Sequence, residues 1–251
     1  MKKVIVFTFL SFLIPFGIFI YLLKKVATPE LFIHSHLIHG VVMVAICLVS
    51  FFVAYRAYLS YFYSKKVEEL FLTIAFYMFG LIFLIHGIFV PGFLFIDELL
   101  FDVFEHTGLF LGSFLFLGLG LSLTKRKEWI YNNRSKIITG VVASTIAYPI
   151  FILGTPPIAE YIGSKLDIIT GLTSVFFLLS IFVLLSKYRK QASSLTLYLS
   201  VSFAMLINTG IIPFFYEEWN IVWWYFHILT LISFLVLLVG LLKGDKYNIV
   251  K

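Results

Sequence analysis

The fold is decided by a stretch that reads Phe83-Leu84-Ile85-His86-Gly87-Ile88-Phe89-Val90-Pro91-Gly92. It places one imidazole near the end of a long apolar run, which a Pro-Gly pair then ends. A titratable side chain that can bind metal is costly inside an apolar span and indicates a function. We therefore expect His86 to lie in a membrane-spanning helix and to belong to a binding site.

The composition of the whole chain indicates a membrane protein. Of its 251 residues, 61% are hydrophobic and 13% are charged, and the mean hydropathy is +1.03. Soluble domains carry about 25% charged residues, so long uncharged runs at half that value are typical of a polytopic membrane protein. The single cysteine, Cys47, excludes an intrachain disulfide and a multi-cysteine metal or iron–sulfur site.

Apolar runs of about 20 residues predict an all-α, polytopic transmembrane helix bundle of about eight spans, seven plus an N-terminal one. The predicted spans lie at 4–23, 35–55, 69–90, 103–124, 137–155, 167–186, 194–214 and 221–242. The first is longer than the hydrophobic region of a signal peptide, and no A-x-A site follows it. We expect residues 1–251 to form one integral membrane domain with no soluble domain, and so no nucleic-acid partner despite the net charge of +6.

Basic side chains are segregated to one side of the predicted spans. With eight spans both termini share a side, and sixteen of the nineteen Lys and Arg residues fall on it. Because cytoplasmic loops are rich in Lys and Arg, this pattern predicts a cell-membrane protein with both termini in the cytoplasm. Nine of the thirteen acids fall on the outer side. There they attract cations, or they simply keep loops soluble where bases are depleted.

All six histidines fall in the outer third of the predicted spans. Four of them lie at similar depth on four different helices: His39, His86, His106 and His227. Because a buried imidazole needs a partner, we expect these four to share one cofactor-binding site. His36 shares a helical face with His39, whereas His34 is expected to point elsewhere, toward the lipid headgroups.

A carboxylate joins this set at Asp102. It lies four residues before His106, so it can accept a hydrogen bond from that imidazole or bind the same metal. Glu98 extends this face by one turn, whereas Glu105 is rotated away from it by about 100°. The predicted metal ligands are His36, His39, His86, His106, His227 and Asp102. Such a set suits zinc, copper or iron, and two histidines on facing helices can instead hold haem b.

Two stretches resemble a known kind of membrane region. They are Phe83-Leu84-Ile85-His86-Gly87, followed by Pro91-Gly92, and Trp223-Trp224-Tyr225-Phe226-His227. Both are similar to the multi-span sensor-like region found ahead of diguanylate cyclase, adenylate cyclase or histidine kinase domains in some bacterial membrane proteins. The resemblance implies a membrane input module with His86 and His227 as its shared site. Because no output domain follows the last predicted span, it also implies a cytoplasmic or membrane signalling partner.

These observations favour a non-enzymatic sensor or receptor that binds a metal ion or haem near the outer face. The alternative is a redox or metal-dependent membrane enzyme that uses the same histidines, with Asp102, Glu105 or Glu98 as a general base. A transporter is less favoured, because no charged side chain lies in the middle of a predicted span.

Overall fold

The computed structural model describes residues 2–25, 33–88, 98–122, 127–190, 194–215 and 219–245, and the regular structure in these ranges is helical. Seven of the helices described are long and apolar enough to cross a membrane. The prediction of an all-α chain with the helices of a multi-pass membrane protein is therefore confirmed. The described helices fall into two compact units.

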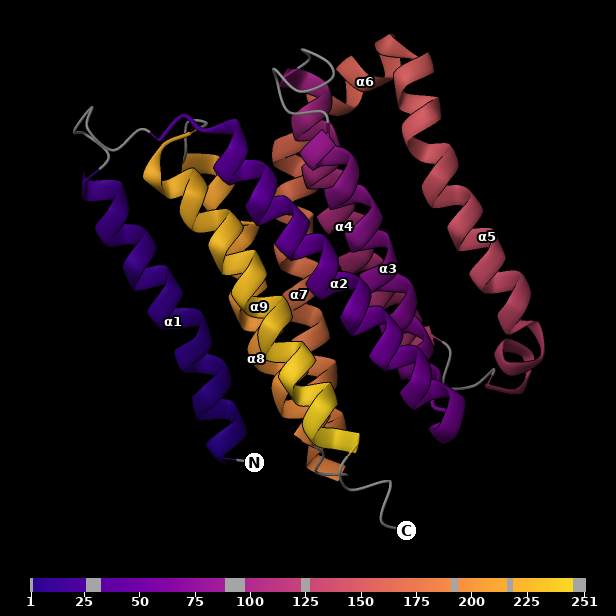
Figure 1. Cartoon of the computed structure of the whole chain (residues 1–251). Helices are drawn as coiled ribbons and strands as arrows, with labels where there is room; N and C mark the ends of the chain where they lie inside the picture. The colour runs from indigo at the N-terminus through magenta and orange to yellow at the C-terminus, as the bar shows by residue number, and fades with distance from the viewer. Residues whose placement is uncertain are drawn as a thin grey trace. The chain divides into compact units, whose positions relative to one another are not determined.

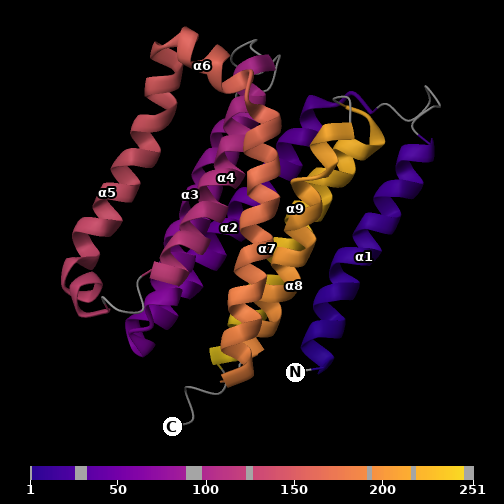
Figure 2. The same ribbon diagram turned by 180° about the vertical axis from the view of Figure 1, so that it is seen from behind.

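The first unit comprises Met1–Val42 and Thr170–Lys251. Its elements are α1 (Lys2–Lys25), most of α7 (Leu166–Lys190), α8 (Ser194–Thr209), the 3₁₀ helix η2 (Ile212–Phe215), α9 (Ile221–Asp245) and the first residues of α2. Helices α8 and α9 run side by side, and α1 contacts both (Figures 1 and 2). The beginnings of α2 and α9 lie at the same end of this unit (Figure 1).

Polar side chains on α8 and α9 hold α1 in place. The Asn208 side-chain amide donates to the carbonyl oxygen of Phe12 at 3.3 Å, and the Tyr225 hydroxyl donates to that of Pro15 at 2.9 Å. Hydrogen bonds of this kind join helices where apolar surroundings offer no other partner. Asn208 is thus an interhelical hydrogen-bond donor.

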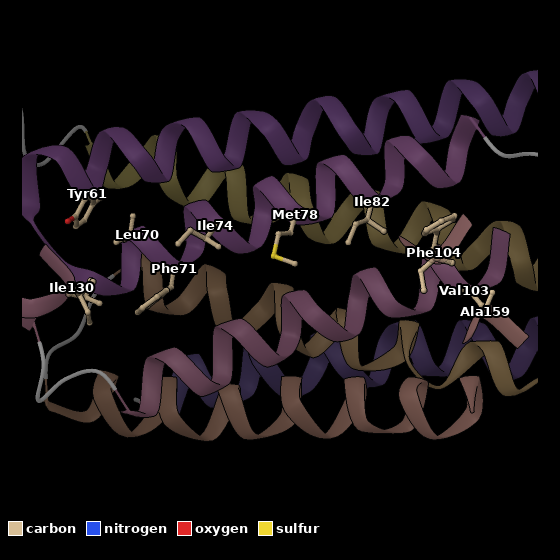
Figure 3. Packing of buried hydrophobic residues seen from close by; sticks show 12 residues of the cluster. Tyr61, Leu70, Phe71, Ile74, Met78, Ile82, Val103, Phe104, Ile130 and Ala159 are labelled. Atoms are coloured by element: carbon tan, nitrogen blue, oxygen red, sulfur yellow. The ribbon is translucent and has the colours of Figure 1, made fainter. Parts of the chain in front are cut away.

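The second unit comprises Met43–Ile169. It contains most of α2 (His36–Ser64), followed by α3 (Val67–Ile88), α4 (Glu98–Ser122), α5 (Lys127–Gly154) and the short α6 (Pro156–Gly163). Figure 3 shows its buried core, in which Ile74, Met78 and Ile82 form a row along one helix, α3. Phe104 and Val103 of α4 extend the same core.

Two glycines let α3 and α4 approach closely. Their spacing, Gly108 and Gly112, is the small-xxx-small pattern that brings membrane helices together. A methyl group added at Gly108 would overlap Ile82, and one added at Gly112 would overlap Phe79. This close approach brings the last turn of α3 beside the second turn of α4, where the polar residues of this unit lie.

Large apolar side chains remain exposed on the outer helices. Phe7, Leu48, Ile150 and Phe182 are each more than half exposed, at 54%, 54%, 67% and 61%. Soluble monomers rarely carry such extended apolar faces, whereas lipid tails cover them without cost. The exposed faces therefore agree with helices that lie in a bilayer.

The predicted span 103–124 differs from the helix found there. Helix α4 begins at Glu98, five residues early, so His106 lies two turns inside the helix rather than at its start. Helix α4 is not among the seven candidate spans found in the described residues. The count of eight spans, like the single membrane domain over 1–251, stays a prediction. Pro91-Gly92 lies outside the described residues; α3 is described to Ile88.

Helix ends that carry basic residues gather within each unit. One end of the first unit holds four helix ends: the starts of α1 and α8 and the ends of α7 and α9 (Figures 1 and 2). Lys243 accordingly donates to the Tyr198 hydroxyl at 2.9 Å. In the second unit Lys65, just after α2, lies 5.5 Å from the ring of Tyr131, near the start of α5. The side of the membrane that these ends face stays a prediction.

Candidate metal centres

The second unit buries a carboxylate beside an imidazole. Helix α3 supplies His86 from its last turn, and α4 supplies Glu105 from its second turn; neither side chain has any exposed area. The Nε2 atom of His86 lies 4.0 Å from the Oε1 atom of Glu105. A carboxylate inside an apolar bundle is costly unless a positive charge or a metal ion balances it. The pair is therefore arranged as a balanced charge pair or as two ligands of one ion.

Two further side chains of α4 extend this pair. One ligand atom each from Asp102, Glu105 and His106 lie within 4.8 Å of one another. The three residues follow the i, i+3, i+4 spacing that places side chains on one helical face. Ligands of a single ion at about 2.1 Å are about 3–4 Å apart, so small side-chain rotations complete this set. We refer to His86, Asp102, Glu105 and His106 as the histidine–carboxylate cluster.

Glu105 is the residue that the sequence analysis missed as a ligand. The expectation that it turns away from the face of Asp102 and His106 was wrong, because Glu105 lies three residues after Asp102 and neighbours at this spacing share a helical face. A signal was present in the sequence. A carboxylate within a predicted span is rare and is usually functional.

The first unit brings two other predicted ligands together. The rings of His39 and His227 are 5.1 Å apart between centroids, with an interplanar angle of 89°. Both side chains are fully buried. Two imidazoles that bind one tetrahedral ion at about 2.1 Å would have centroids about 5 Å apart. The spacing of this pair fits two ligands of such an ion.

The proton of His227 is placed by its own helix. Its Nδ1 atom lies 2.9 Å from the carbonyl oxygen of Trp223, one turn earlier in α9. Because a carbonyl oxygen only accepts, Nδ1 carries the hydrogen in this contact, and Nε2 of the neutral ring keeps its lone pair. Histidines that bind metals commonly donate their other N–H to a carbonyl or carboxylate in this way. His227 is therefore oriented as an Nε2 ligand.

Tryptophans surround these two imidazoles. The ring of Trp223 lies 5.0 Å from that of His39 and 4.2 Å from that of His227. Trp219 lies 4.9 Å from Trp223 and takes a backbone φ of 67°, a conformation that a bulky residue rarely adopts. The next residue, Asn220, accepts from the N–H of Trp223 at 2.8 Å and so caps the start of α9.

His34 and His36 join the same group. Their rings lie 4.4 Å and 4.9 Å from that of Trp219, and 4.9 Å from each other. The expectation that His34 points elsewhere was wrong, because α2 begins at His36 and the helical spacing does not extend back to residue 34. We call this group the histidine–tryptophan cluster: His34, His36, His39, Trp219, Trp223, Trp224 and His227.

The predicted ligands are thus divided between the two units. His36, His39 and His227 meet in the first, while His86, Asp102 and His106 meet in the second, joined by Glu105. That His39, His86, His106 and His227 share one site stays a prediction. Trp219 and Asn220 were not anticipated from the sequence, because their positions depend on the backbone turn that precedes α9.

Comparisons with known proteins find no match, so the function is inferred from these residues. No protein-family model matches the chain, and searches of curated proteins and of solved structures find no match.

Proposed function

We propose that this chain is a multi-pass membrane protein that binds a divalent transition-metal ion through buried histidines and acids. The observation that supports this proposal most strongly is the burial of His86 and Glu105 together, with Asp102 and His106 near the same carboxylate. The buried carboxylate of Glu105, the half-buried one of Asp102 and two buried imidazoles offer an ion four ligands and balance its charge.

The donor atoms favour some ions over others. Oxygen and imidazole nitrogen together suit zinc, iron(II) and manganese(II), whereas copper(I) prefers sulfur ligands. The histidine–tryptophan cluster offers imidazole nitrogens alone, which favour copper(II) and zinc. We therefore propose zinc, iron or copper as the bound metal, with a different preference in each cluster.

Haem b is less well supported at the pair His39 and His227. Two imidazoles on opposite sides of one iron, at about 2.1 Å each, would have ring centroids about 6 Å apart, with a porphyrin between them. The 5.1 Å separation and the nearly perpendicular planes fit a tetrahedral ion better.

A sensor-type role is favoured over catalysis because the innermost ligands of both clusters are fully buried. A catalytic metal keeps one coordination position open for water or substrate. His39, His86, Glu105 and His227 each have no exposed area, which suits an ion that is held rather than one that reacts. We propose an input module that acts through a cytoplasmic or membrane partner. A metal-dependent membrane enzyme is the second candidate, and it would require the helices to open.

Metal analysis of the purified protein tests the proposal. The detergent-solubilised protein should carry a stoichiometric metal ion, measured by elemental analysis together with an absorption spectrum. The double variant His86→Ala/Glu105→Gln should lose the ion of the histidine–carboxylate cluster, and His39→Ala/His227→Ala any ion of the other cluster. If all four histidines share one ion, either double variant removes all of the metal.

A matched control separates loss of metal from loss of fold. Ser50 is fully buried and donates to the carbonyl oxygen of Phe76 at 2.6 Å, so Ser50→Ala perturbs a buried polar contact without touching a proposed ligand. It should keep its metal. Colourless, metal-free wild-type protein that is as stable as both double variants would contradict the proposal.

Cysteine labelling tests the proposed orientation in the membrane. Leu37 and Tyr63 lie at opposite ends of α2 and are equally exposed, at 79% and 80%. In a Cys47→Ala background, Leu37→Cys should react with an impermeant maleimide added to intact cells, and Tyr63→Cys only after permeabilisation. The reverse pattern would place the termini outside the cell.

A further inference from the structure

The histidine–tryptophan cluster forms a graded series of imidazoles from the surface inward. His34 is exposed, His36 is half-buried, and His39 and His227 are fully buried. The two outer rings are 4.9 Å apart and the two inner rings 5.1 Å apart. Both pairs thus have the spacing of two ligands of one tetrahedral ion.

One indole ring connects the two pairs. Trp219 lies 4.4 Å from His34, 4.9 Å from His36 and 5.9 Å from His39. The indole itself offers no ligand atom, because its nitrogen is a donor only. Trp219 therefore separates an outer imidazole pair from an inner one and holds both in position.

The segment that carries the outer pair is fixed to α9. The N–H of Ile33 donates to the carbonyl oxygen of Trp219 at 3.0 Å, and the indole N–H of Trp224 donates to the carbonyl oxygen of Ile33 at 2.9 Å. Ser35 then caps α2, since its hydroxyl oxygen accepts from the N–H of Ile38 at 3.4 Å. A segment fixed at both ends orients its imidazoles before any ligand arrives, which lowers the entropic cost of binding.

One atom of the outer pair has no hydrogen-bond partner among the residues that the structure describes. The Nδ1 atom of His36 is buried and makes no hydrogen bond to the described residues. A buried imidazole nitrogen without a hydrogen bond costs free energy, unless a ligand satisfies it. This nitrogen is therefore suited to bind a metal ion.

We propose that His34 and His36 capture a divalent ion of the zinc–copper class at the surface and pass it to His39 and His227. The capture step stands on the outer pair alone. The transfer step rests on the proposed function, because it needs the inner pair to bind metal. Four imidazoles with no sulfur ligand prefer copper(II) and zinc over manganese and magnesium, so the series also selects the ion.

Quenching of tryptophan fluorescence by Cu²⁺ tests the capture step. The chain has four tryptophans, and in a Trp129→Phe background the other three all lie in the cluster. His39→Ala/His227→Ala is added to this background so that the inner pair cannot bind the ion. Cu²⁺ added to the metal-stripped protein in detergent should then quench the tryptophan emission through the outer pair alone. Losing even an outer-shell partner of a metal ligand costs about 10–100-fold in affinity. His34→Ala/His36→Ala should therefore raise the half-quenching Cu²⁺ concentration at least about tenfold.

A neighbouring substitution supplies the control. Leu37 is 79% exposed and directly follows His36, so Leu37→Ala changes the same surface without removing a ligand. It should leave quenching unchanged. Unchanged quenching in His34→Ala/His36→Ala, or equal loss in Leu37→Ala, would overturn the capture step. Thermal unfolding of each variant confirms that the fold is intact.

Loading kinetics test the transfer step separately. Metal-stripped His34→Ala/His36→Ala protein should take up Zn²⁺ at least about tenfold more slowly than wild type, yet reach the same final content at the buried sites. Equal loading rates would overturn the transfer step. If Cu²⁺ quenching depends on His34 and His36 while purified protein holds no buried metal, the capture site stands and the proposed function fails.

Discussion

The two clusters use the same imidazole chemistry with different companions. The histidine–carboxylate cluster combines His86 and His106 with two acids, whereas the histidine–tryptophan cluster surrounds its imidazoles with three indoles. The acids add negative charge, while the indoles add large rings for packing and N–H hydrogen-bond donors. The comparison shows that a histidine in a span indicates a site, but its neighbours decide what the site can hold.

Charge balance separates the two clusters most clearly. A divalent ion between Asp102 and Glu105 would be neutralised by two carboxylates, which stabilises it in apolar surroundings. An ion held by imidazoles alone keeps its double positive charge, which is costly to bury. We therefore expect the histidine–carboxylate cluster to retain its ion and the histidine–tryptophan cluster to exchange it.

The largest expected effect is a difference in ion preference between the clusters. Manganese(II) prefers oxygen ligands, so its binding should require Glu105 and should not require His39. Glu105→Gln should weaken Mn²⁺ binding about 100-fold, and His39→Ala by less than about threefold, measured by electron paramagnetic resonance of free Mn²⁺. Equal losses would remove the distinction between the clusters.

An effect of similar size should follow from breaking the buried pair in metal-stripped protein. Removing one partner of a buried ion pair costs about 3–5 kcal/mol, because the other charge is left uncompensated. His86→Ala should therefore lower the free energy of unfolding by about 3 kcal/mol. Adding Glu105→Gln to it should restore part of that loss, as measured by unfolding in detergent. Purely additive losses would show that the two side chains do not interact.

The smallest expected effect concerns the hydrogen bond that fixes Ile33 to α9 in the histidine–tryptophan cluster. Trp224→Phe keeps an aromatic ring but removes the N–H that Ile33 accepts, so it should cost about 1 kcal/mol of unfolding free energy. Trp129→Phe is the control, because Trp129 is 56% exposed and should change stability by less than about 0.5 kcal/mol. A negligible cost in Trp224→Phe would mean that the hydrogen bond does not hold the segment.

The sequence predicted the helices well because apolar length and charge depend only on local composition. It also predicted that His39 and His227 belong to a site. It did not predict the role of Glu105, because which acid reaches His86 depends on the close approach of α3 and α4 at Gly108 and Gly112. That approach is a property of packing, and periodicity alone does not give it.

The position of His34 was misjudged for a different reason. Helical periodicity placed His34 away from His36, but α2 begins between them, at a cap that depends on Ser35. The contacts of Trp219 with both rings depend on a positive φ at a residue for which that conformation is uncommon. The resemblance to sensor-like regions, and the signalling partner that it implies, stay predictions.

The two hydrogen bonds on α1 have a consequence for how this helix keeps its place. The acceptors, Phe12 and Pro15, are three residues apart on one face and are reached from α8 and α9 respectively. Apolar contacts in lipid are non-directional, so a helix held by such contacts alone can slide or rotate among equivalent positions at little cost. Two directional contacts one turn apart therefore fix both the depth of α1 along its axis and its rotation about that axis.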